Sequence, residues 1–119
     1  MTPAEDTPHL ETVTIFRSRL AAGHDAEFAE LEAATEARVR SLGGLVEFKT
    51  FVAPDGERLS LVVFEGQDAH ERWREDELHQ AAQRAGKARL FSSFEVLVCR
   101  LERRRVGPEG ASRPRQVGA

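Results

Sequence analysis

Two side chains that could do chemistry, Trp73 and His79, lie six positions apart in the segment ERWREDELHQAAQ, residues 71–83. Histidine exchanges protons near neutral pH, and tryptophan can form the wall of a ligand pocket. On a continuous helix, at about 100° per residue, the two side chains would diverge by roughly 120°. They can share a cavity only if the helix breaks, and Asp76 could end one helix and cap the next. Without that break, Trp73 packs the helix onto the core and His79 faces water.

Strand and helix patterns alternate around this segment. Four β-branched or aromatic runs predict strands at Thr12–Leu20, Leu45–Ala53, Glu57–Glu65 and Phe91–Leu101. Apolar spacings of three and four predict a helix that begins near His24 or Asp25 and ends at Gly43–Gly44. A second helical region is expected from about Gly66 to Gly86. The order β-α-β-β-α-β predicts an α+β, ferredoxin-like fold with both helices on one face of a four-stranded antiparallel sheet.

The predicted strands are apolar on both faces, although two helices cover only one. Leu61 and Val63 point to one face, and Val62 and Phe64 point to the other. We therefore expect a homodimer in which a second copy covers the open face of the sheet. Cys99, in the last strand, is expected to be buried and inert.

Two arginines in the first strand, Arg17 and Arg19, lie on a face that is otherwise apolar. Charged side chains in such a place need partners. We expect carboxylates such as Glu47, across the sheet or in the second copy, to fill that structural role.

Composition limits the classes of function. The chain has 119 residues, of which 40% are hydrophobic and 31% charged, and its formal net charge is -3. These values predict one globular domain at residues 12–102, between a flexible leader at 1–11 and a disordered basic tail at 103–119 rich in Pro and Gly. The charge gives no electrostatic case for nucleic acid, and no apolar run suits a membrane span. A cytoplasmic location is expected, because the start carries no signal-peptide pattern.

Sequence patterns for bound cofactors are absent. The chain has no glycine-rich dinucleotide or phosphate loop, no H-E-x-x-H and no G-x-S-x-G. Its four histidines are dispersed, and its single cysteine excludes a multi-cysteine metal site. We therefore expect neither a cofactor nor a metal. The seven phenylalanines form core, or some of them line a pocket for a flat aromatic ligand.

The segment from Val46 to Leu101 resembles the antibiotic biosynthesis monooxygenase family of dimeric α+β barrels. The resemblance lies in the D-G-E turn at 55–57, the W-x-x-x-x-x-H helix, the A-A-Q-R-x-G that follows, and the apolar last strand. With the first strand and helix it extends over about residues 12–102. It implies a homodimer with one pocket per subunit, in which phenolic or anthrone-like polyketides react with O2 without flavin, haem or metal.

The resemblance also implies roles for particular residues. His79 would be the base that deprotonates the substrate, and Trp73 would shape the pocket or stack on the ligand. Phe16, Phe48 and Phe91 are expected to line the substrate site.

Three alternatives stay open beside the oxygenase. Haem-degrading monooxygenases of the same fold use Asn, Trp and His in their pocket. In this chain Phe16 stands where the Asn is expected, and the interval from Trp73 to His79 is shorter than expected for those enzymes. A non-catalytic dimer that binds a small molecule, or a polyketide cyclase, is compatible with the same residues.

Overall fold

The computed structural model describes residues 10–108, except for the side chains of Leu78, Ala82, Ala85, Lys87 and Ala88. The predicted leader and tail therefore fall largely outside the described residues, and the predicted domain limits stay predictions. Within residues 10–108 the elements follow the predicted order, with the second helical region divided in two. They are β1 (Thr12–Leu20), α1 (Asp25–Leu42), β2 (Leu45–Val52), β3 (Arg58–Phe64), α2 (Gln67–Glu75), α3 (Glu77–Arg89) and β4 (Phe91–Arg100).

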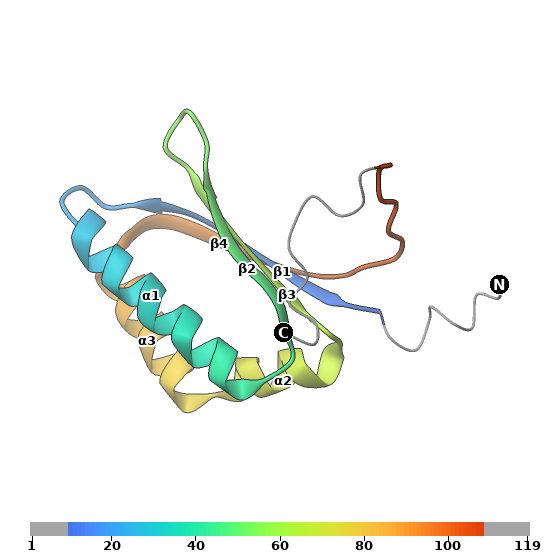
Figure 1. Ribbon diagram of the computed structural model, residues 1–119. Helices are drawn as coiled ribbons and strands as arrows, with labels where there is room; N and C mark the ends of the chain where they lie inside the picture. The colour runs from blue at the N-terminus through green and yellow to red at the C-terminus, as the bar shows by residue number, and fades with distance from the viewer. Residues whose placement is uncertain (1–9, 109–119) are drawn as a thin grey trace, which may run out of the picture.

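The strands form one antiparallel sheet in the order β2-β3-β1-β4. In its centre, Thr14 of β1 lies opposite Val62 of β3 on one side and Val98 of β4 on the other. The helices all lie on one face of the curved sheet, with α1 and α3 side by side beneath it and α2 across one end (Figure 1). The α+β, ferredoxin-like fold predicted from the sequence is confirmed.

The core lies between the sheet and the α1–α2 end of the helical layer. Its fully buried centre joins Phe64 and Val62 of β3 to Val39 of α1 and to Trp73 and Ala69 of α2. Phe64 and Val39 have no exposed surface. Burial of one such side chain stabilises the fold by about 1.5–3 kcal/mol. Trp73 therefore fastens α2 to the sheet at the same time as it borders the pocket described below.

Part of the opposite face of the sheet is open, although Val63 at one end of it is only 2% exposed. Phe51 and Leu97 keep 46% and 37% of their surface exposed there, and Ile15 and Leu61 are half-buried. Cys99 is exposed, so the prediction that it is buried is wrong for the single chain. The reason is topological, because β4 is an edge strand and the apolar pattern of a strand does not tell an edge position from a central one.

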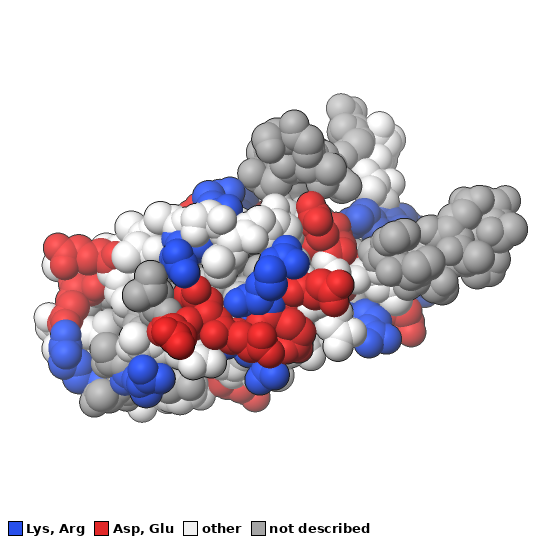
Figure 2. All heavy atoms as spheres, turned by 90° about the horizontal axis from the view of Figure 1, so that it is seen from below, with Lys and Arg blue, Asp and Glu red and all other residues white. Residues whose placement is uncertain are grey.

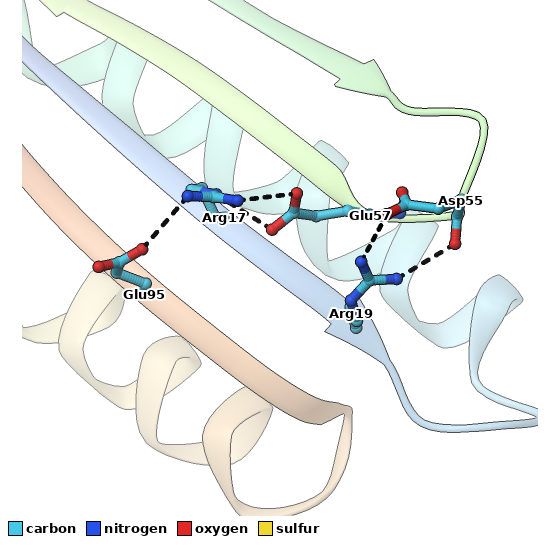
Figure 3. Close-up of polar contacts among 5 residues, drawn as sticks. All are labelled: Arg17, Arg19, Asp55, Glu57 and Glu95. Atoms are coloured by element: carbon cyan, nitrogen blue, oxygen red, sulfur yellow. Dashed lines mark hydrogen bonds and ion pairs between the residues drawn. The ribbon is translucent and has the colours of Figure 1, made fainter.

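Arginines on this open face pair with carboxylates (Figure 3). Arg17 binds Glu57 at 3.0 Å and lies 3.6 Å from Glu95, while Arg19 binds Asp55 at 2.8 Å. The sequence predicts carboxylates such as Glu47 as partners, and in the single chain carboxylates of the β2–β3 turn and of β4 fill that role. These pairs join the hairpin turn to β1 across the sheet.

The outer surface of the helices carries charges of both signs. Seen from the helical side, acidic side chains gather near the middle of this surface, with Lys and Arg side chains around them (Figure 2). None of the helices among residues 10–108 is long and apolar enough to cross a membrane.

Candidate functional site

The helix breaks at Asp76. Its ψ of 126° takes the chain out of the helical conformation for one residue, so α2 ends at Glu75 and α3 begins at Glu77. The Asp76 carboxylate accepts a hydrogen bond of 2.8 Å from the backbone N–H of His79. An aspartate at the N-cap satisfies one of the free N–H groups of the first turn. The break on which a shared Trp73–His79 pocket depends is therefore present.

Arg38 of α1 holds this junction in place. Its Nη2 donates to Oδ1 of Asp76 at 2.6 Å, and its Nε donates to both carboxylate oxygens at 3.1 Å. The hydrogen bond from Arg38, with that from the His79 backbone, lowers the pKa of Asp76 although burial acts to raise it. The side chain of Asp76 is only 7% exposed. The ionised carboxylate thus ties α1 to the point where α2 turns into α3.

The break brings the rings of Trp73 and His79 face to face. Their centroids lie 3.3 Å apart and their planes differ by 20°. His79 Nδ1 is 3.0 Å from the backbone carbonyl oxygen of Trp73. Because a carbonyl only accepts hydrogen bonds, Nδ1 carries the proton in this contact. In the neutral ring, Nε2 is then the nitrogen with the basic lone pair.

A pocket lies between the sheet and the helices, with the Trp73–His79 stack in its wall. The cavity volume is about 100 Å³, and the empty space that includes the open mouth is about 690 Å³. The wall is largely apolar. It is formed by residues of β1, β3, β4 and the helices α1, α2 and α3, and β2 contributes one residue, Phe48. Its residues are Thr14, Phe16, Phe28, Leu31, Glu32, Thr35, Phe48, Ser60, Val62, Trp73, His79, Gln83, Phe91 and Val96.

All five residues predicted for the site line this one pocket. Phe16 and Phe91 meet edge to face, with ring centroids 5.3 Å apart, and Phe48 packs beside the core cluster. The sequence did not require this, because each phenylalanine could equally have been core. Their roles toward a substrate stay predictions. The phenyl ring of Phe16 also offers no hydrogen bond at the position where haem-degrading relatives are expected to carry Asn.

The sequence interpretation missed the polar groups of the pocket. Glu32 of α1 accepts a hydrogen bond from the Thr50 hydroxyl of β2, whose oxygen lies 3.1 Å from the Ser60 hydroxyl of β3. The Thr14 hydroxyl is buried and has no hydrogen-bond partner among the described residues. A signal was present for Glu32, because it follows Phe28 by four positions and so places a charge on the apolar stripe of its helix.

No group of three or more metal-binding side chains lies close enough to hold an ion among the residues that the structure describes. What the site offers is an oriented imidazole, a stacked indole, an apolar cavity and a short chain of hydroxyls that ends on a carboxylate. That set can position a small aromatic molecule and move a proton.

Solved structures share this architecture. SnoaB, a cofactor-independent oxygenase from Streptomyces nogalater, superposes with a TM-score of 0.70 at 22% identity, over 83% of this chain and 98% of SnoaB. A candidate antibiotic biosynthesis monooxygenase from Nitrosomonas europaea gives 0.67 at 10% identity, over 77% and 90%. The chain has the antibiotic biosynthesis monooxygenase fold.

The protein SO0527 from Shewanella oneidensis has a similar structure, with a TM-score of 0.69 at 15% identity over 77% of this chain and 91% of SO0527. No protein-family model matches the chain, and no curated protein matches it in sequence. At these identities the similarity of the structures establishes the fold, whereas the chemistry depends on the residues of the pocket.

Proposed function

We propose that this protein is a cofactor-independent monooxygenase that uses O2 to oxidise a phenolic, polyketide-like aromatic, with His79 as the base. The observation that carries the proposal is the orientation of the imidazole. Its Nδ1 is held by the Trp73 carbonyl, so Nε2 is the atom that accepts a proton in a pocket with an apolar wall. SnoaB, which has the same fold, is a cofactor-independent oxygenase.

The surroundings of His79 favour the charged imidazolium that proton transfer creates. The indole of Trp73 lies flat against the ring, and the face of an aromatic ring attracts a cation. The Trp73 carbonyl is at the C-terminal end of α2, where the helix dipole is negative, and the Asp76 carboxylate lies nearby. The positive charge that His79 gains from a phenolic proton is thus balanced by the indole, the carbonyl and the carboxylate.

The proposed reaction needs no external reductant. A phenolate or enolate passes one electron to O2, and the resulting radical and superoxide recombine at carbon to form a hydroperoxide. In an anthrone-type substrate the carbon that bears the hydroperoxide was a CH2, and loss of water turns it into a carbonyl, so one oxygen atom ends in the product and the other in water. The electrons come from the substrate C–H bonds. The protein supplies position, exclusion of water and the proton acceptor.

We further propose that the working unit is a homodimer formed through the open face of the sheet. Phe51 and Leu97 are exposed on that face beside half-buried Ile15 and Leu61. Large apolar side chains left open on a sheet are characteristic of a surface that pairs with another copy. The carboxylate-paired Arg17 and Arg19 lie on the same face and give it a polar border.

Oxygen uptake with an anthrone or a dihydroxynaphthalene tests the assignment of the base. His79→Ala should lower kcat by about 10²-fold or more, the usual contribution of a general base. His24→Ala removes a histidine that does not line the pocket and should leave the rate unchanged. Equal uptake by wild type and His79→Ala would remove His79 from the mechanism. Binding of these compounds without any uptake by the wild type would favour the accessory dimer or the cyclase.

A further inference from the structure

The pocket has a second polar end, which the proposed base does not use. Glu32 of α1, Thr50 of β2 and Ser60 of β3 form a continuous hydrogen-bonded chain beneath the helices. Glu32 and Ser60 both line the pocket, and Ser60 is only 8% exposed. We call these three residues the hydroxyl relay.

The direction of the hydroxyl relay follows from its donors and acceptors. The single proton of the Thr50 hydroxyl goes to the Glu32 carboxylate. The Thr50–Ser60 contact of 3.1 Å must then have Ser60 as its donor. Since the Ser60 proton is used in this way, the Ser60 oxygen can only accept a hydrogen bond from a bound molecule. The relay therefore presents an acceptor, with the negative charge of Glu32 behind it.

Sheet register places the relay away from the Trp73–His79 stack. Val39 packs with Trp73, and Glu32 precedes Val39 by seven residues of α1, about 10 Å along the helix axis. On β3, Val62 belongs to the Trp73 cluster, and Ser60 is the next residue on the same face toward the hairpin turn. The two polar ends are therefore offset from each other along the pocket.

Thr14 lies on the floor of the pocket, toward the Trp73–His79 end. It opposes Val62 across the β1–β3 pair, and its buried hydroxyl has no partner among the described residues. A buried hydroxyl without a partner is costly, so an oxygen atom of a ligand that accepts its proton would relieve that cost. Thr14 can therefore donate to an oxygen atom of a molecule bound in the pocket.

We infer that the hydroxyl relay Glu32–Thr50–Ser60 is a specificity site for a second hydroxyl group, at the far end of the aromatic substrate from the one that His79 deprotonates. The inference rests on the proposed function for the role of His79, and names a substrate class: a flat aromatic with oxygen functions at both ends, of which the distal one carries a proton. A methyl ether or a hydrogen at the distal position leaves the Ser60 acceptor without a donor.

Binding measured by calorimetry without O2 tests this inference apart from turnover. The probes are a dihydroxynaphthalene with its hydroxyls on opposite rings and the naphthol that lacks one of them. Wild type should bind the diol about 5- to 10-fold more tightly than the naphthol, as expected for one additional hydrogen bond. Ser60→Ala should remove this preference by weakening only the diol. Glu36→Gln, one turn further along α1 and outside the pocket, should keep it.

Two results would overturn the relay: equal affinities for both probes in the wild type, or an undiminished preference in Ser60→Ala. Ser60→Cys, which keeps the side-chain shape but accepts a hydrogen bond only weakly, carries the same test if Ser60→Ala does not fold. The His79→Ala variant separates the two proposals. It should keep the diol preference while losing oxygen uptake, so failure of the oxygenase leaves the binding result to decide the relay.

Discussion

The guanidinium of Arg38 clamps the Asp76 carboxylate through Nε and Nη2, so that one residue of α1 fixes the point at which α2 gives way to α3. Asp76 in turn holds the backbone of His79. The position of the proposed base therefore depends on a contact outside the pocket. Removing either partner should disturb the site without touching its wall.

Asp76→Ala removes both the helix cap and the Arg38 contact. We expect the rings of Trp73 and His79 to separate, and kcat to fall by roughly 10²-fold, the cost of a misplacement near 1 Å. Trp73 is the only tryptophan, so its fluorescence spectrum reports the loss of the stack directly. Asp25→Ala, in the first turn of α1, is the matched control and should leave both readouts unchanged. A wild-type spectrum and rate in Asp76→Ala would show that the cap does not position His79.

The acid sensitivity of this junction has a defined sign. The pKa of Asp76 is lowered from 3.8, chiefly by the hydrogen bond from Arg38. The stability that its ionised form contributes is complete above that ordinary value, and is lost as the pH falls through the lower folded value. Arg38→Met brings the folded pKa back toward the ordinary one. The acid transition of Trp73 fluorescence should therefore move to higher pH in Arg38→Met, and an unmoved transition would contradict the assignment.

How much the sequence predicted differs between the site and the sheet. Asp76 could be identified as a break because cap chemistry is local, and its partner N–H lies three residues away. The edge position of Cys99 could not, because an apolar run reads alike in an edge strand and a central one. Glu32 was visible as a charge in an apolar stripe. Its contact with Thr50 depends on how α1 is rotated over the sheet, which tertiary packing decides.

His70 gives the fold a second pH dependence. His70 is 7% exposed, and its ring packs edge-on against Phe64, with centroids 5.5 Å apart. Burial lowers the pKa of His70 from 6.5. The unfolded chain thus binds a proton more readily, so stability falls as the pH drops below 6.5 toward the folded value. Thermal melts from pH 7.5 to 5.5 should show a flatter dependence in His70→Leu than in wild type. Parallel dependences would rule out His70 as the source.

The proposed dimer places Leu97 at the contact between two sheets, and Leu97→Asp tests that placement. Leu97 lies opposite Ile15 on the open face, and a carboxylate there would be buried without a partner in the dimer. Wild type should scatter light as a species of twice the chain mass of 13.3 kDa, and Leu97→Asp as one of 13.3 kDa. Ala33→Asp, which adds the same charge to an exposed position of α1, should remain dimeric. A monomeric wild type at micromolar concentration would show that the open face serves another purpose, whereas a dimer that survives Leu97→Asp would place the interface elsewhere on the molecule.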